Sequence, residues 1–200
     1  MFEIARRLTL AEQAEILSAC RHVIQQAPLF TKTMPPTGAA FRYQCTSAGR
    51  YGWISDRTGF RYVGQHPVTQ HPFPPLPPII HQLATDIASQ YDLALRPETA
   101  LINWYAADGK LGLHQDKTEV SRAPVISISV GDDCVFIMGG MKRTDKKQDM
   151  ILQSGDVLIM GAEDRLRFHG VKKIISGTAP PELNLKQPGR LNITVRQVYR

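Results

Sequence analysis

The stretch RLNITVR, residues 190–196, decides the fold because its polar and apolar residues alternate strictly. Successive side chains of a β-strand point to opposite faces, so one face carries Arg190, Asn192, Thr194 and Arg196. One interpretation is an antiparallel strand whose polar face lies in water. The other is a strand whose polar face lines the interior of a barrel. Two arginines in that interior require anionic partners, because an unpaired buried charge is costly.

Short strand-like runs surround this stretch beyond Pro97, and Gly, Asp or Pro clusters separate many of them. They span residues 101–105, 125–130, 134–138, 156–160, 166–170, 171–175 and 191–198. Regular short strands without helices between them are typical of a sandwich or a barrel. We therefore expect a β barrel or jelly roll in the C-terminal part of the chain.

The first 97 residues have a different character, with helical patterns and proline-rich loops. The sequence Thr9-Leu10-Ala11-Glu12 is a capping box, which predicts a helix from about residue 10 to 26. Apolar spacing predicts a second helix over about residues 78–91. Residues 28–64 are expected to form short strands and loops, and six prolines from Pro67 to Pro78 exclude a helix or central strand there. The chain is thus predicted to be mainly β with N-terminal helices.

Length and composition exclude several classes of protein. The 200 residues suit one domain, and a hydrophobic fraction of 42% excludes wholesale disorder. No apolar run approaches the roughly 18 residues of a membrane helix, and no apolar segment follows Arg6 and Arg7 as in a signal peptide. Three cysteines without C-x-x-C spacing argue against a disulfide framework or a structural zinc site, so we expect a cytoplasmic protein.

The net charge of +6 is confined to the end of the chain. Residues 142–200 hold 12 basic and 6 acidic residues, whereas residues 1–141 hold 12 of each. Such asymmetry favours a polyanionic partner, nucleic acid first, and an unevenly charged solvated surface is the alternative. Lys142, Arg143, Lys146 and Lys147 form the densest cluster, which we expect either to meet phosphates or to sit in water.

A metal site is predicted by His114-Gln115-Asp116, because residues i and i+2 of an extended segment point the same way. The best second histidine is His169, which follows a strand-like run at the far end of the β-rich region. Two histidines and one carboxylate leave three positions of an ion open, an arrangement that suits Fe(II) oxygenases. Taken alone, His114 and Asp116 are also consistent with a surface histidine that happens to lie near an aspartate.

Taken together, the polar motifs resemble the AlkB family of Fe(II)- and 2-oxoglutarate-dependent dioxygenases over about residues 40–198. These motifs are Asn103-x-Tyr105, His114-x-Asp116, Arg165-x-x-x-His169-Gly170 and Arg190-x-Asn192-x-Thr194-x-Arg196. The resemblance implies a double-stranded β-helix, a cupin-like jelly roll, over residues 98–200. Residues 1–97 would hold the N-terminal helices and a substrate-recognition lid, within a single domain of residues 1–200.

The resemblance also implies roles in catalysis. His114, Asp116 and His169 would hold Fe(II). The cosubstrate 2-oxoglutarate would be bound by Asn103, Tyr105, Arg190, Asn192 and Arg196. With O2, the family oxidises a methyl group on a base nitrogen and releases formaldehyde, succinate and CO2. The implied substrates are 1-methyladenine and 3-methylcytosine in DNA, single strands favoured, or in RNA, and the implied role is direct reversal of alkylation damage.

Substrate recognition is implied for residues from several parts of the chain. Trp53 matches a position that stacks on the flipped base opposite His169, although a buried core tryptophan is the alternative. Arg143 matches a position near the substrate. Phe60 stands where the family's bacterial prototype carries a tyrosine that reaches a phosphate.

Two further departures from the family's bacterial prototype affect the base pocket. Thr118 stands where the prototype has an acidic residue that helps to recognise the base, and Glu119 follows it. Recognition of an exocyclic amino group therefore passes to Glu119 or weakens. Met160 replaces a tryptophan, which loosens the pocket wall.

Two alternatives to a nucleic-acid demethylase stay open at this point. One is a dioxygenase of the same chemistry that acts on a modified RNA base, a protein side chain or a small molecule. The other is a catalytically silent nucleic-acid-binding module. In each case we expect a monomer without membrane contact.

Overall fold

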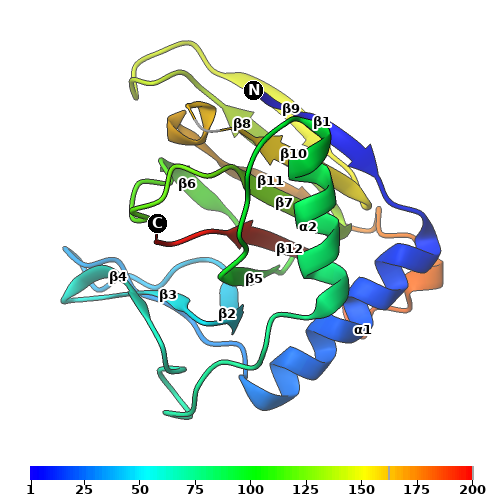
Figure 1. Ribbon diagram of the computed structural model, residues 1–200, viewed down its shortest axis with the longest axis horizontal. Coiled ribbons are helices and arrows are strands. Elements are labelled where there is room, and N and C mark those ends of the chain that lie inside the picture. Colours follow the sequence, from blue (N-terminus) through cyan, green and yellow to red (C-terminus); the bar gives the residue numbers. More distant parts are fainter. Residues whose placement is uncertain (162, 200) are drawn as a thin grey trace.

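The computed structural model describes residues 1–161 and 163–199, and most of their regular structure is antiparallel β-sheet (Figure 1). The elements are β1 (Phe2–Arg7), α1 (Leu10–Gln26), β2 (Gln44–Gly49), β3 (Gly52–Asp56), β4 (Gly59–Val63), α2 (Pro78–Gln90), β5 (Thr99–Tyr105), β6 (Leu111–His114), β7 (Val125–Gly131), β8 (Asp133–Met138), β9 (Gln148–Leu152), β10 (Asp156–Met160), η1 (Asp164–Leu166), β11 (His169–Ile175), η2 (Pro181–Leu183) and β12 (Arg190–Arg196).

A six-stranded sheet forms the main layer, in the order β1-β10-β7-β12-β5-β2. The strictly alternating strand, β12, lies inside this sheet and pairs with β5 on one side and β7 on the other. Strands β1 and β2 come from the first 50 residues of the chain. The main sheet therefore contains strands from before and after Pro97 in the sequence.

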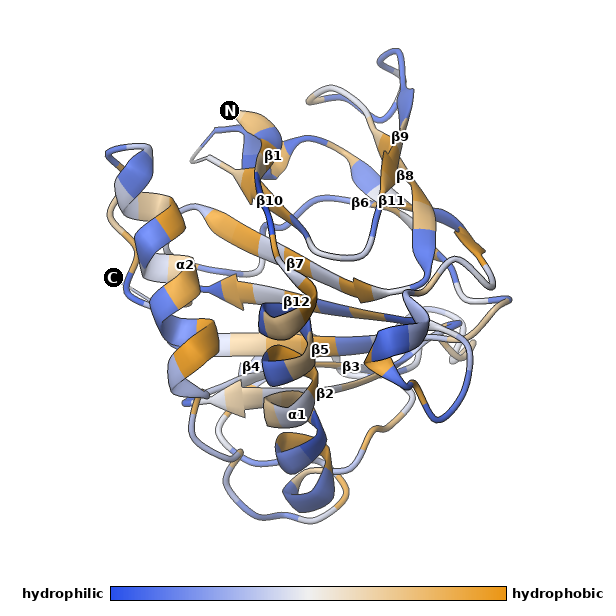
Figure 2. Ribbon diagram, turned by 90° about the vertical axis from the view of Figure 1, so that its right-hand side faces the viewer, coloured by the Kyte–Doolittle hydropathy of each residue, from blue (hydrophilic) through white to orange (hydrophobic). Residues whose placement is uncertain are grey.

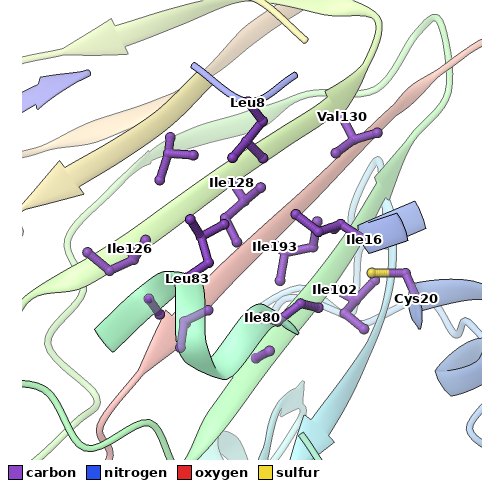
Figure 3. Close-up of a cluster of buried hydrophobic side chains, with 14 of the residues drawn as sticks. Leu8, Ile16, Cys20, Ile80, Leu83, Ile102, Ile126, Ile128, Val130 and Ile193 are labelled. Carbon is purple, nitrogen blue, oxygen red and sulfur yellow. The ribbon is translucent and has the colours of Figure 1, made fainter. Parts of the chain in front are cut away.

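Two helices cover the outer face of the main sheet, as Figure 2 shows. Both were predicted, and the capping box is present: Thr9 accepts a hydrogen bond from the amide of Glu12, whose side chain accepts one from the amide of Thr9. Apolar residues of the helices and of the sheet interlock in one core cluster (Figure 3). Within it, Leu191, Ile193 and Val195 of β12 face the helices.

A second sheet of four strands, in the order β6-β11-β8-β9, lies across the inner face of the main sheet. Between the two sheets, the polar face of β12 lines a cavity together with residues of β6 and β11. The prediction that this face lines a barrel interior is therefore confirmed. The chain has the expected mainly β jelly-roll fold with N-terminal helices.

The β3–β4 hairpin stands apart from the helices, on the opposite side of the main sheet (Figures 1 and 2). Its tight turn places Gly59 at φ 120°, a left-handed conformation that a side chain would strain. The hairpin corresponds to the short strands expected between residues 28 and 64. All three cysteines are buried with free thiols.

One strand prediction was wrong. The run 166–170 was expected to be a separate strand, but residues 164–166 form a 3-10 turn and the strand begins only at His169. The strand then continues to Ile175, so one strand replaces the two that were expected over residues 166–170 and 171–175. Strands β1, β6 and β9 were not predicted, because all three are edge strands with few buried side chains. Among the described residues, no helix has the length and apolar character needed to cross a membrane.

Candidate active site

Strand pairing brings the two histidines of the predicted metal site together. His114 ends β6 and His169 begins β11, and the antiparallel register places them directly opposite each other. Asp116 follows two residues after β6, with its oxygens 3.6 Å from Nε2 of His114 and 3.7 Å from Nε2 of His169. One ligand atom from each residue lies within 4.8 Å of the others. This spacing suits three ligands around one ion.

Backbone contacts orient both imidazoles toward the common centre. Nδ1 of His114 lies 3.0 Å from the carbonyl oxygen of Gly112, and Nδ1 of His169 lies 2.9 Å from that of Arg167. A carbonyl oxygen only accepts, so each Nδ1 carries the proton and each Nε2 offers its lone pair. Burial and the neighbouring His169 lower the pKa of His114 to about 4. At neutral pH this ring is therefore uncharged, as a metal ligand must be.

A buried charge network fixes the carboxylate of the triad. Nη2 of Arg196 lies 3.0 Å from Oδ2 of Asp116, and Nη1 of the same arginine donates to Glu119 at 2.6 Å. Arg165 donates to the other oxygen of Glu119 at 2.7 Å, and Tyr62 also donates to Glu119. Burial opposes ionisation of Asp116, but the charge of the neighbouring Arg196 guanidinium outweighs it and holds the pKa of Asp116 well below the ordinary range.

A cavity of about 50 Å³ lies beside the triad, between the two sheets. Its lining includes all five residues that the resemblance assigns to the cosubstrate: Asn103, Tyr105, Arg190, Asn192 and Arg196. Arg190 is 1% exposed and donates to two carbonyl oxygens and to Ser129, but its buried Nε has no partner. An anionic ligand would satisfy this donor, so the residues fit a dicarboxylate such as 2-oxoglutarate.

A second cavity of about 460 Å³ opens beside the first and shares Asn103, His114 and Arg196 with it. One wall comes from the β3–β4 hairpin, where Trp53 and Phe60 stack with ring centroids 5.5 Å apart and planes 9° apart. A large aromatic-walled cavity thus leads to the triad.

Comparisons with known proteins agree with this geometry. The family model of the 2OG-Fe(II) oxygenase superfamily matches residues 4–196. An alpha-ketoglutarate-dependent dioxygenase AlkB homolog of Caulobacter vibrioides is 37% identical over 191 residues, which cover 95% of this chain and 84% of the relative. The chain belongs to the AlkB family of this superfamily. It is accordingly a dioxygenase that uses Fe(II), 2-oxoglutarate and O2.

The solved structure of OsALKBH1 has the same fold as this AlkB-family chain, with a TM-score of 0.82 and 32% identity, over 98% of this chain and 97% of that one. Two relatives match about half of this chain and less than two fifths of their own length. They are the DNA N(6)-methyladenine demethylase ALKBH1C of Arabidopsis thaliana, 43% identical over 109 residues, and the tRNA demethylase abh1 of Schizosaccharomyces pombe, 38% identical over 112 residues.

The structure brings most of the residues expected to bind substrate to the large cavity of this AlkB-family chain. Trp53, Phe60, Thr118 and Arg143 line it, and Nε1 of Trp53 donates to Oγ1 of Thr118 at 3.4 Å. Glu119 is different, because it lies outside the lining, is 3% exposed and accepts from two arginines and Tyr62. Of the two expected outcomes, this placement favours a weakened recognition of an exocyclic amino group over recognition by Glu119.

The structure also locates Met160 and the basic cluster relative to the two cavities. Met160 lines the small cavity rather than the large one. Lys142, Lys146 and Lys147 are exposed in the β8–β9 turn, and Arg143 in the same turn donates to the carbonyl oxygen of Leu113 at 3.0 Å. The basic cluster thus borders the mouth of the large cavity through Arg143.

Lys32 was not predicted from the sequence, yet it lines the large cavity and is only 3% exposed. Its Nζ lies 4.3 Å from the ring centroid of Trp53 and 5.8 Å from that of Tyr43. Burial lowers the pKa of this ammonium group. No sequence signal marks Lys32, because a lysine before Met34-Pro35-Pro36 is expected in a solvated loop.

Proposed function

We propose that this chain demethylates N-methylated bases of nucleic acid by oxidation. The observation that carries the proposal is the large aromatic-walled cavity, which shares His114 with the smaller cavity at the triad. A base presented against Trp53 and Phe60 then has a short path to the metal ligands. Relatives named as a DNA demethylase and a tRNA demethylase support a nucleic-acid substrate.

His114, Asp116 and His169 are the proposed iron ligands. Bound Fe(II), 2-oxoglutarate and O2 supply the oxidation, which yields succinate and CO2 and converts the methyl group to formaldehyde. Other groups of the chain hold the three proposed iron ligands in a fixed orientation. The backbone carbonyls at Nδ1 fix the two rings, and Arg196 keeps Asp116 ionised and turned toward them.

Arg190 is the proposed partner of the far carboxylate of 2-oxoglutarate, through its unsatisfied Nε. Asn192, which lines the small cavity, is held by its amide donation to Ser127 at 2.8 Å. Tyr105 and Asn103 complete the proposed cosubstrate wall opposite the small sheet. These groups position the cosubstrate and exclude water from it.

The substrate must reach the cavity as an extruded or unpaired base, because a stacked base inside a duplex lies out of reach. Single-stranded DNA or RNA spares the energy of unpairing, so we propose single strands as the preferred form. We further propose a monomeric, cytoplasmic enzyme of one domain, in which the β3–β4 hairpin within residues 1–97 acts as the recognition lid. The buried free thiols support a reducing compartment.

The test is formaldehyde release from a panel of oligonucleotides. Each carries one of 1-methyladenine, 3-methylcytosine, 1-methylguanine, 3-methylthymine or N6-methyladenine, in DNA and RNA, single-stranded and duplex. Asp116→Ala should abolish formaldehyde release and iron binding, whereas Asp149→Ala, at a half-exposed surface pair with Lys172, should leave both unchanged. Iron-dependent 2-oxoglutarate turnover without formaldehyde from any base would shift the proposal to another substrate class. Equal iron binding by wild type and Asp116→Ala would indicate a silent binding module.

A further inference from the structure

Lys32 is a buried cation that faces the large cavity without an anionic partner. Its Nζ lies over the Trp53 ring, and the groups that influence its ionisation are Cys45 and Arg196. Across residues 1–161 and 163–199, no carboxylate forms an ion pair with it. Burying an ammonium group costs free energy, and the contacts of Lys32 with an aromatic face and with the Cys45 thiol offset only part of that cost. An oxygen acceptor supplied by the substrate would satisfy it.

The charges around the large cavity are predominantly positive. Its described lining holds four cationic side chains, Lys32, Lys117, Arg143 and Arg196, and one carboxylate, Asp116. That carboxylate already pairs with Arg196 and belongs to the triad. Lys117 and Arg143 are exposed and can meet phosphates, whereas Lys32 lies within the wall. The base itself therefore meets an uncompensated positive charge.

Nearby acidic groups do not relieve this charge. Thr118 lines the cavity as a neutral hydroxyl, and Glu119 is engaged by Arg165 and Arg196 outside the lining. Methylation at N1 of adenine or N3 of cytosine leaves the base ring positively charged. Methylation at N1 of guanine or N3 of thymine leaves the ring neutral, with a carbonyl oxygen next to the methylated nitrogen. Lys32 repels the first pair electrostatically and can donate a hydrogen bond to the second.

We propose that Lys32 is a specificity-determining residue that selects neutral methylated bases with a carbonyl oxygen beside the methylated nitrogen, as in 1-methylguanine and 3-methylthymine, over cationic ones. This inference rests on the proposed demethylase function and names the substrate class of the same site. Trp53 supplies the aromatic wall, and the ammonium group of Lys32 marks where the carbonyl edge of the base lies.

The test separates charge from the carbonyl group with four kinds of base. 1-Methyladenine is cationic without a carbonyl oxygen, 3-methylcytosine is cationic with one, N6-methyladenine is neutral without one, and 1-methylguanine and 3-methylthymine are neutral with one. The measurement is kcat/KM for formaldehyde release from single-stranded oligonucleotides. We expect the wild type to favour the neutral carbonyl bases over 1-methyladenine by about tenfold or more, since a hydrogen bond to a charged donor contributes this much.

Lys32→Met should lower kcat/KM for 1-methylguanine and 3-methylthymine by about 10- to 100-fold and raise it for 1-methyladenine. Lys32→Arg keeps the charge and the donors, so it should keep the order of preference. Lys186→Met, at an exposed lysine, is the matched control and should change no ratio. Thermal unfolding followed by circular dichroism verifies that each variant is folded.

Three results would overturn the inference: a wild type that prefers cationic bases, an equal effect of Lys32→Met on every base, or a lost preference in Lys32→Arg. Equilibrium affinities for the same oligonucleotides, measured without iron, give an independent version of the ratio. If no base releases formaldehyde, the demethylase function fails, while the affinity ratio still decides the role of Lys32.

Discussion

Two regions beside the large cavity differ in how their charges are satisfied. We call the charged network of Asp116, Arg196, Glu119 and Arg165 the floor, and the part lined by Lys32, Trp53 and Phe60 the wall. At the floor, Asp116 pairs with Arg196, and Arg196 and Arg165 both pair with Glu119. In the wall, Lys32 lies against aromatic rings, and Trp53 stacks on the half-exposed Phe60. The carboxylates of the floor are thus paired with arginines of the same chain, while the wall leaves a donor and an aromatic surface for a ligand.

This contrast separates the part of the fold that fixes the metal-site geometry from the part that leaves substrate specificity open. Charges in a buried, low-dielectric site hold one another in place, so the floor presents its metal ligands in a fixed arrangement before any substrate arrives. The wall contributes affinity and specificity only when a base supplies the missing partner. Changes at the floor should therefore affect folding and turnover, and changes at the wall should affect which substrate is chosen.

Glu119→Gln should produce the largest effect, because it removes the anion that two buried arginines share. We expect the free energy of unfolding to fall by about 3–5 kcal/mol, measured by urea denaturation. Asp149→Asn, at an exposed pair, should cost less than about 1 kcal/mol. Equal losses in the two variants would show that the floor network is not a special stabilising feature.

The ion pairs of Glu119 with the two arginines also predict that the stability of the folded state depends on pH. Burial favours the protonated form of Glu119, but the neighbouring charges, Arg196 foremost, hold its pKa below the ordinary range. The folded state therefore gains stability above the ordinary glutamate pKa, and this gain is lost as the pH falls through the folded-state value. The loss should be absent in Glu119→Gln.

Arg190→Lys tests the cosubstrate side of the floor. A single ammonium group cannot reproduce the donation to Ser129, to two carbonyls and to a carboxylate at once. We expect the apparent KM for 2-oxoglutarate to rise by about tenfold or more, measured as succinate formation at saturating iron. Arg7→Lys, at a surface-facing pair with Asp156, serves as the control. An unchanged KM would contradict the proposed role of Arg190.

Trp53→Ala tests the wall. Loss of a stacking surface should weaken binding of a methylated single strand by about 1–3 kcal/mol. Tyr199→Ala, at an aromatic pair with Tyr51 away from the cavity lining, is the control. A large fall in thermal stability, with no selective loss of nucleic-acid affinity, would instead identify Trp53 as a structural residue.

The smallest effect is expected at the basic turn between β8 and β9. Replacing Lys146 and Lys147 with Gln should weaken binding uniformly across base types. It should also reduce the slope of log affinity against log salt by about 1 for each phosphate that a lysine no longer neutralises. The same double replacement at Lys172 and Lys173 of β11 should leave the slope unchanged. A changed base preference in the Lys146 and Lys147 variant would contradict a purely phosphate-directed role.

The sequence predicted the floor better than the wall. Strict alternation in residues 190–196 placed Arg190 and Arg196 on one face, and antiparallel pairing then turned that face into the cavity. The i, i+2 spacing of His114 and Asp116 predicted that the two side chains lie together, which they do, although β6 ends at His114 and Asp116 lies just beyond it.

The wall could not be predicted in the same way, since it depends on contacts between distant loops. Lys32 is buried by Tyr43 and Trp53, which no local pattern links to it. Because Glu119 follows Thr118 in the sequence, we expected it near the base. In the structure its carboxylate pairs with Arg165 and Arg196 instead. The edge strand β1 lacked alternation, so only its partner β10 reveals it.

The positions of the two tryptophans provide a built-in optical probe. Trp53 stands in the cavity wall, whereas Trp104 packs against the core cluster beneath the helices, outside the cavity lining. Intrinsic fluorescence from this chain therefore contains one emitter exposed to an arriving base and one internal reference. Quenching by an oligonucleotide, compared with a Trp53→Phe variant, would follow base capture in real time without any attached dye.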